Sequence, residues 1–207
     1  MRTFLAVDLS DKVRKELGRF CLALANGAKR QGSHRPLRWT TTANLHVTLH
    51  FLGENLRAEH LPVLDEALRR HLAGIKRFNI ALQGFGGFPD ERRPRIYWVG
   101  IGTGVEELHA LSDRAAAALD EVGVAHDARR FQPHVTICRA SDAREQRMRG
   151  EPPPMPTELL NLSHWVQGIG ARDLKIGDSF PVQALTLYES VLKPEGPHYQ
   201  VLNRITL

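Results

Sequence analysis

Two copies of one tripeptide, His-Val-Thr, are the residues of this sequence best suited to chemistry. They occur as His46-Val47-Thr48 and as His134-Val135-Thr136, and an aliphatic residue follows the threonine in each copy. The chain has ten histidines in 207 residues, so a single His-x-Thr has little significance. Two copies that share the central valine are much rarer, and we therefore interpret them as a pair of functional motifs.

Each motif opens a segment that is predicted to be a β-strand. Side chains alternate between the two faces of a strand, so His46 and Thr48 share one face while Val47 points to the other. His134 and Thr136 share a face in the same way. Two such strands facing one cleft would supply two imidazoles as general acid and base, and two hydroxyls to hold a phosphoryl group. This chemistry needs no metal and no cofactor, and we expect neither.

Residues beside the motifs are candidates for substrate binding. Arg129, Arg130 and Arg139 flank the second motif and are suited to contacts with a nucleic-acid backbone, although the sequence leaves open which of them points inward. We select Arg130 and Arg139. Phe85 and Phe88 lie in a glycine-rich segment, where a phenyl ring can stack on a base or anchor the segment in the core. We select Phe85 for stacking.

Two other residues near the motifs suggest alternative chemistry that the pattern disfavours. Strand alternation places His50 on the face of His46, at the rim of the expected cleft. A zinc-binding helix would require Glu where Val47 stands. Cys138 is interpreted as a small, half-buried residue, since nothing in the sequence marks its thiol as activated. Because Cys21 is its one possible partner, no disulfide framework is expected, which indicates a reducing, cytoplasmic location.

Composition agrees with a globular protein whose surface is mildly basic, which favours a solvated basic surface over a nucleic-acid partner when the charge is considered alone. Hydrophobic residues make up 42% and charged residues 25% of the chain, which argues against disorder. The formal charge of +5, from 28 Lys and Arg against 23 Asp and Glu, is mildly basic. Asp8 ends the first apolar run too early for a signal peptide, and no run approaches the length of a membrane span. We expect no association with membranes.

The surrounding pattern predicts a mixture of strands and helices of the α+β class with antiparallel sheets. A Gly-rich loop is expected over 84–89, a polar loop from the first helix to the second strand, and a proline-rich connector over 151–156. Strands are expected over 3–9, 45–52, 78–82, 95–101, 134–139, 182–192 and 199–207, and helices over 10–28, 61–72, 108–119 and 158–166.

These motifs resemble the two-histidine phosphoesterases, and specifically the RNA 2′,3′-cyclic phosphodiesterases that are also described as 2′-5′ RNA ligases. The resemblance covers almost the whole chain and is specific at the family level; Gln132 and Cys138 are minor departures. It rests on Arg2–Asp8, His46–Glu54, Gly84–Gly86 with Phe88-Pro89, Arg95–Gly100, Phe131–Thr136 and Gly196–Tyr199.

The resemblance implies two pseudo-symmetric lobes, each an antiparallel sheet with outer helices, around a central cleft. Residues 1–207 would form a single bilobal domain whose lobes exchange strands. It also implies hydrolysis of an RNA terminal 2′,3′-cyclic phosphate, with His46 as proton donor, His134 as acceptor and a 2′-phosphomonoester as product. The near-identical motifs themselves do not distinguish the roles of the two histidines.

Three alternatives to this reaction stay open on the sequence. The same site can run in reverse as an ATP-independent ligase of 2′,3′-cyclic and 5′-hydroxyl RNA ends. The substrate can be a free cyclic nucleotide or an ADP-ribose cyclic phosphate rather than RNA. A module that binds nucleotides or RNA without catalysis is the third, although binding alone does not require two paired acid/base groups. We expect the protein to act as a monomer.

Overall fold

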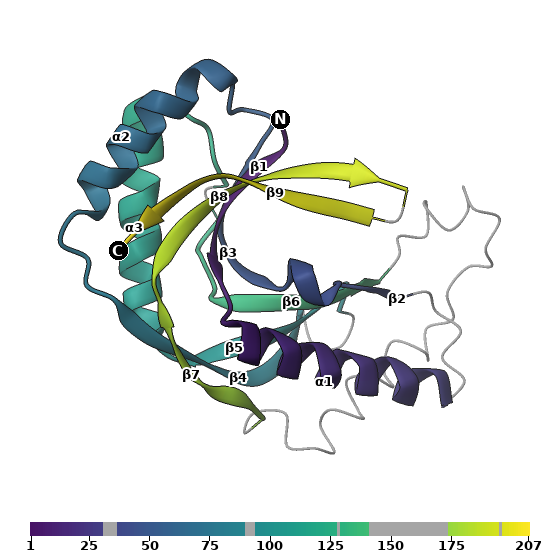
Figure 1. Ribbon diagram of the computed structural model, residues 1–207. Helices are drawn as coiled ribbons and strands as arrows, with labels where there is room; N and C mark the ends of the chain where they lie inside the picture. Colours follow the sequence, from purple (N-terminus) through teal and green to yellow (C-terminus); the bar gives the residue numbers. More distant parts are fainter. Residues whose placement is uncertain (31–36, 90–93, 128, 141–173, 195) are drawn as a thin grey trace.

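All the strand pairings in the described part of the chain are antiparallel, and together they build one strongly curved sheet (Figure 1). The structure is a computed structural model that describes residues 1–30, 37–89, 94–127, 129–140, 174–194 and 196–207. Its strands are β1 (Thr3–Asp8), β2 (Leu37–Trp39), β3 (His46–Gly53), β4 (Phe78–Phe88), β5 (Ile96–Thr103), β6 (His134–Ala140), β7 (Lys175–Val182), β8 (Ala184–Lys193) and β9 (Gly196–Thr206). Their order is β7-β4-β5-β6-β3-β1-β8-β9, and β2 pairs with β6.

Among the described residues, three α-helices cover the outside of this sheet: α1 (Asp11–Arg30), α2 (Leu61–Leu72) and α3 (Val105–Val122). Short 3₁₀ turns precede β3 (η1, Thr42–Asn44) and α2 (η2, Ala58–His60). Along α2, Leu64, Leu68 and Leu72 recur at helical spacing and are all buried, so burial of one apolar stripe explains this helix. Helix α3 ends at Gly123, whose left-handed backbone lets its N–H bond to carbonyls of the last turn.

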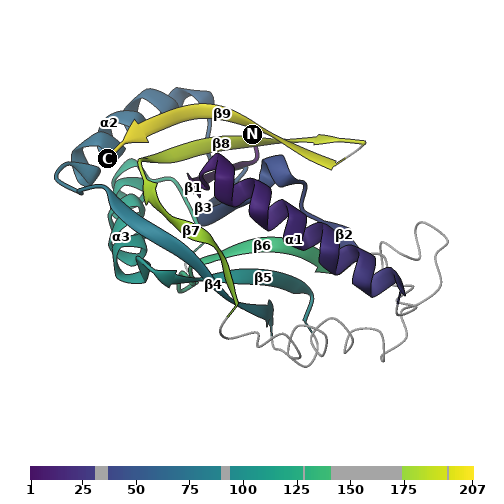
Figure 2. The same cartoon turned by 60° about the horizontal axis from the view of Figure 1, so that its bottom comes forward.

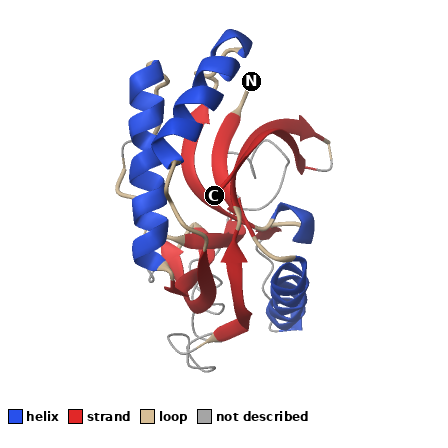
Figure 3. Cartoon of the chain, turned by 60° about the vertical axis from the view of Figure 1, so that its left-hand side comes forward, coloured by secondary structure: helices blue, strands red, loops and turns tan. Residues whose placement is uncertain are grey.

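The helices lie at two well-separated places on the sheet. Helices α2 and α3 pack against each other, beside β9 and β3 respectively. Helix α1 directly follows β1 in the chain, yet it packs against β7 in the other half of the sheet. Figures 2 and 3 show this separation, with α1 far from the α2–α3 pair. No helix among the described residues is long and apolar enough to cross a membrane.

One hydrophobic core runs through both halves of the molecule. It includes fully buried aliphatic residues of β1, β3, β5, β6 and β8, namely Leu5, Val47, Val99, Val135 and Leu185. Strands β3 and β6 connect the halves, and they pair through Val47 and Val135. The α+β class and the antiparallel pairing are therefore confirmed, while the separate sheets expected for the two lobes are joined into one.

Three segments differ from the pattern expected from the sequence. The loop expected over 84–89 continues β4 as far as Phe88. Glycine is required at position 86 because a Cβ there would lie 2.3 Å from the Trp98 ring. The glycine that suggested a loop is therefore explained by the close approach of the indole to the strand. Strand β2 falls within the expected polar loop, and β7 was not predicted. The predicted connector at 151–156 and helix at 158–166 lie outside the described residues.

Candidate active site

The two motifs begin strands β3 and β6, and burial alternates along each as predicted. Val47 and Val135 are completely buried, whereas His46, Thr48, His134 and Thr136 are partly exposed. The valines pack into the core, and this packing holds in place the backbone from which the side chains of the opposite face project. Each imidazole and its hydroxyl therefore project from the same side of a strand that is held rigidly from behind.

Hydrogen bonds to backbone carbonyls fix the tautomer of both imidazoles. Nδ1 of His46 lies 2.7 Å from the carbonyl oxygen of Asn44, and Nδ1 of His134 lies 2.6 Å from that of Gln132. A carbonyl can only accept, so each Nδ1 must carry a proton. In both neutral rings Nε2 is then the unprotonated nitrogen. In His46 this atom lies 2.8 Å from Oγ1 of Thr48, whose hydroxyl can donate to it.

The antiparallel pairing of Val47 with Val135 brings the two motifs together. In an antiparallel pair, the residue before one valine lies across from the residue after the other. His46 is thus placed on the side of Thr136, and Thr48 on the side of His134. The four side chains form a pseudo-twofold arrangement on one face of the β3–β6 junction.

Each motif is followed by one extra residue that disturbs the regular pairing. In β3, Thr48 pairs with Ala6 and His50 with Leu5, so Leu49 is the extra residue. In β6, Thr136 pairs with Trp98 and Cys138 with Tyr97, so Ile137 is the equivalent residue. This irregularity occurs at the same place in both halves. Beyond each threonine, it exchanges which strand residues face the core and which face outward.

The expectation that His50 lies at the cleft rim is wrong for this reason. The extra residue turns His50 away from the face of His46 and into the core, where it is 7% exposed. Its Nε2 lies 2.9 Å from the backbone oxygen of Ser112 in α3. Cys138, the equivalent residue of the second half, is likewise completely buried. The next residues, Phe51 and Arg139, turn outward instead.

A cavity of about 370 Å³ lies against the first motif and part of the second. Strand β3 contributes His46, Thr48 and Phe51, and β6 contributes Thr136 and Arg139. Gly53 at the end of β3 also lines the cavity, and the remaining lining residues come from β1 and the residue before it, the segment before β3 and the β8–β9 hairpin: Arg2, Thr3, Phe4, Thr40, Asn44, Ser190 and Tyr199. The cavity therefore combines a histidine, threonine hydroxyls, arginines and aromatic rings.

Of the residues selected for substrate binding, the structure brings one to this cavity. Arg139 lines it, whereas neither Arg130, which is exposed elsewhere, nor Phe85 is among the described lining residues. Phe85 pairs with the completely buried Val99 and packs against the core. It follows that Phe85 takes the anchoring role that the sequence also allowed, and not the stacking role selected for it.

Aromatic rings surround both imidazoles, and of these the sequence singled out only Phe88. The ring of Phe4 stacks on His46 with centroids 4.9 Å apart, and Tyr199 meets the same imidazole edge-on at 5.4 Å. Phe88 and Trp98 lie 5.0 and 6.1 Å from His134. The rings come from four different strands, so no local pattern in the sequence could have revealed that they converge.

Known proteins are similar to this chain in both sequence and fold. The family model described as the 2′-5′ RNA ligase superfamily matches residues 6–165. The chain belongs to this superfamily. A protein from Aeropyrum pernix named RNA 2′,3′-cyclic phosphodiesterase is 34% identical over 172 residues, which is 82% of this chain and 86% of that protein. A protein of the same name from Thermus thermophilus is 30% identical and covers 100% of this chain and 90% of its own.

Solved structures agree with the assignment to the superfamily. The crystal structure of TT0787 from Thermus thermophilus superposes with a TM-score of 0.70 at 27% identity, covering 100% of this chain and 98% of that one. Apo E. coli LigT gives a TM-score of 0.66 at 25% identity, covering 99% and 96%. These likenesses extend over the whole curved sheet.

Burial determines the charge of both imidazoles in this member of the 2′-5′ RNA ligase superfamily. Removal from water lowers the pKa of His46 to about 4, despite the opposing effects of the Asn44 carbonyl and the Asp8 carboxylate. It also lowers the pKa of His134, assisted by the charge of Arg139. Both rings are therefore largely neutral at pH 7 in the free protein. An anionic phosphate ester beside them would favour the protonated form.

Other reactive groups in the described part of the chain do not form a competing site. No group of three or more His, Cys, Asp or Glu side chains there is arranged to hold a metal ion. Burial raises the pKa of the Cys138 thiol far above its usual range and that of Cys21 to about 12. Both thiols consequently stay protonated and unreactive at neutral pH.

Proposed function

We propose that this protein hydrolyses the terminal 2′,3′-cyclic phosphate of RNA to a 2′-phosphomonoester by paired histidine acid/base catalysis without a metal ion. The names of relatives that span nearly the whole chain support a cyclic phosphodiesterase. The observation that carries the mechanism is the pairing of two His-x-Thr motifs through Val47 and Val135, with each imidazole held in the Nδ1–H tautomer.

The reaction follows from those two tautomers. In its neutral form, Nε2 of His134 accepts a proton from water, and the water oxygen attacks phosphorus in line with the bond to the ribose 3′-oxygen. As that bond breaks, His46 in its protonated form donates the proton on Nε2 to the departing 3′-oxygen. The hydroxyls of Thr48 and Thr136 donate to the phosphoryl oxygens, and the phosphate stays on the 2′-oxygen.

The assignment of donor to His46 comes from the family resemblance. The two motifs themselves are nearly identical, but their surroundings differ. The cavity adjoins His46, Thr48 and Thr136 and holds Arg139 at its edge, which suits a phosphate seated between the two strands. Each acid or base of this kind typically contributes 10²–10⁴-fold to the rate.

Ligation by the same site is the second candidate function, because the superfamily to which the chain belongs is described as one of RNA ligases. A 5′-hydroxyl in the place of water would displace the 3′-oxygen and leave a 2′-5′ linkage. The same base would take the proton of either nucleophile and the same acid would protonate the 3′-oxygen, so the concentrations of water and RNA ends decide the balance.

The test is incubation of the protein with an oligonucleotide that ends in a 2′,3′-cyclic phosphate, followed by phosphorus NMR of the product. Parallel reactions contain free 2′,3′-cyclic nucleotides, ADP-ribose cyclic phosphate, or the oligonucleotide together with a 5′-hydroxyl RNA, and one set is exhaustively chelated. We expect a single 2′-phosphomonoester at an unchanged rate after chelation. A dominant 3′-phosphate would contradict the mechanism, as would a loss restored by magnesium or zinc. Binding without turnover would indicate the non-catalytic module.

A further inference from the structure

The two halves of the site differ in the residue that stands opposite each histidine. In the β1–β3 pair, Asp8 is opposite His46. In the equivalent β5–β6 pair, Gly100 is opposite His134. Side chains of directly opposed residues start about 4.5–5.5 Å apart on the same face of the sheet. One imidazole thus has a carboxylate as its neighbour across the strand, and the other has a residue with no side chain.

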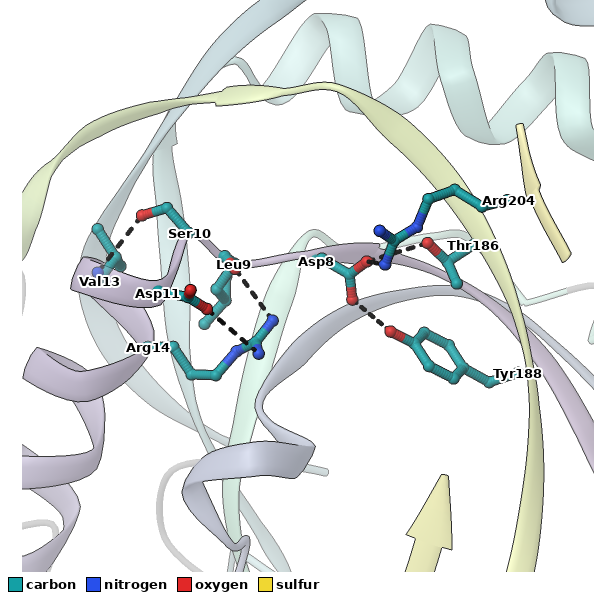
Figure 4. A network of polar contacts seen from close by, with 9 residues as sticks. All are labelled: Asp8, Leu9, Ser10, Asp11, Val13, Arg14, Thr186, Tyr188 and Arg204. Atoms are coloured by element: carbon teal, nitrogen blue, oxygen red, sulfur yellow. Dashed lines mark hydrogen bonds and ion pairs between the residues drawn. The ribbon is translucent and has the colours of Figure 1, made fainter. Parts of the chain in front are cut away.

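Three donors hold the Asp8 carboxylate in place (Figure 4). Oδ2 accepts from Oγ1 of Thr186 at 3.0 Å and from the guanidinium of Arg204 at 2.9 Å, and Oδ1 accepts from the hydroxyl of Tyr188. Burial, together with the hydrogen bond to Asp8 and its charge, raises the pKa of Tyr188 to about 12. The phenol therefore stays protonated and remains a donor throughout the neutral range.

The other charged groups around the two imidazoles oppose protonation of both rings, and Asp8 acts against them at His46. Around His46, the charge of Asp8 favours the protonated ring, while Arg139 of β6 and Arg14 of α1 disfavour it. Around His134, the acting charge is Arg139, which disfavours protonation. The phenols of Tyr188 and Tyr199 also face His46 and are neutral, because burial raises the pKa of both.

We propose that Asp8 is a positioning residue that favours the protonated form of His46, in opposition to the burial of this imidazole, and so supports His46 in the role of acid. This inference rests on the proposed function, and it concerns a neighbour that His46 has and His134 lacks. Asp8 acts through the electric field at His46 and not through a bond to it, since Thr186, Tyr188 and Arg204 occupy its oxygens. A purely structural Asp8 would instead only join β1 to β8 and β9.

The test is the titration of both imidazoles by NMR in the wild type and in Asp8→Asn, with resonances assigned from His46→Gln and His134→Gln. Asparagine keeps the shape and an acceptor but loses the charge. We expect the pKa of His46 to fall by about one pH unit and that of His134 to move much less. Because the protonated fraction of the acid limits the reaction above both pKa values, kcat/KM at pH 7 should fall about threefold to tenfold.

Arg204→Gln supplies a change of opposite sign. It removes the cation that partly neutralises Asp8, so the pKa of His46 should rise while His134 stays in place. This variant decides the inference if Asp8→Asn does not fold. An unchanged or raised pKa of His46 in Asp8→Asn, an equal movement of both histidines, or no rise in Arg204→Gln would overturn it. The titrations need no turnover, so absence of cyclic phosphodiesterase activity would refute the proposed function without deciding the role of Asp8.

Discussion

At the scale of single residues, the candidate site depends on the imidazole of His46, which folding removes from water. Nε2 of His46 has only the Thr48 hydroxyl as its partner at 2.8 Å among the described residues, while Phe4 covers one face of the ring. Such an environment penalises the imidazolium, which general acid catalysis nevertheless requires. In the proposed mechanism, the charge of the substrate and of Asp8 recovers the protonated form.

This burial predicts how stability depends on pH. The folded-state pKa of His46, about 4, lies below the ordinary value of 6.5, so between these two values the unfolded chain binds a proton that the folded protein does not. The free energy of unfolding should thus decrease as the pH falls from 6.5 to 4, by at most about 1.4 kcal/mol per pH unit from this group. Urea denaturation at several pH values measures it.

His46→Gln should remove this contribution and flatten the dependence, whereas His198→Gln, at an exposed histidine of the β8–β9 hairpin, should leave it unchanged. A slope that is the same in all three proteins would show that His46 is not held in its neutral form by folding.

Arg139 and Arg130 provide a matched comparison. Both are exposed arginines that flank the second motif, but Arg139 is the one that lines the cavity. Arg139→Gln should raise KM for a cyclic-phosphate oligonucleotide about tenfold, since a lost hydrogen bond to a charged group costs roughly 1.5–3 kcal/mol. Arg130→Gln should change KM less than about twofold. Equal effects of the two variants in steady-state kinetics would mean that the cavity does not mark the phosphate path.

At the scale of elements, the segment before β3 couples the C-terminal hairpin to the first histidine. The carbonyl of Asn44 accepts from Nδ1 of His46, and the side-chain amide of Asn44 donates to the carbonyl of Pro197 at 2.7 Å. The hairpin in turn supplies Ser190 and Tyr199 to the cavity. Asn44 thus positions the imidazole through its backbone carbonyl, and it holds the hairpin that forms one wall of the cavity through its side chain.

Asn44→Ala should therefore weaken substrate binding more than it weakens the fold. We expect KM to rise about threefold to tenfold and amide hydrogen exchange to increase over residues 196–200, because the hairpin loses a hydrogen bond worth roughly 1 kcal/mol. Asn55→Ala is the control, since the amide of Asn55 likewise bonds to a backbone carbonyl, that of Ala125, away from the cavity. Exchange that increases equally in both variants would contradict the coupling.

The elements also show how far the sequence could predict the site. Period-two alternation correctly assigned His46 and Thr48 to one face of β3, because regular strand geometry holds over those residues. It failed at His50 and would fail equally at Cys138, because one extra residue follows each threonine, and nothing in Leu49 or Ile137 distinguishes them from ordinary strand residues. Phe85 lies in a strand and not in the expected loop for a related reason, since the neighbouring Gly86 is explained by the close packing of Trp98.

At the scale of the whole molecule, the two halves share a sheet, a core and the candidate active site. The β3–β6 junction at Val47 and Val135 lies directly behind the four motif side chains. Because the continuous core crosses this junction, the halves should unfold together. Far-UV circular dichroism and tryptophan fluorescence should give one coincident urea transition. Two separate transitions would contradict a shared core.

Val135→Ala should lower the midpoint of that transition without splitting it. The residue is completely buried, so truncation should cost about 1–3 kcal/mol. Val201→Ala, at a valine that is 52% exposed on β9, should change the free energy of unfolding by less than about 0.5 kcal/mol.

The central claim is that His46 and His134 act as one catalytic unit, and a double-mutant cycle tests it most directly. Turnover of an oligonucleotide with a 2′,3′-cyclic phosphate would be measured for the wild type, His46→Gln, His134→Gln and the double variant, each verified as folded by circular dichroism. We predict that each single change lowers kcat at least about 10²-fold and that the double variant is hardly slower than either. Near-wild-type turnover in one single variant, or losses that multiply in the double variant, would contradict the account.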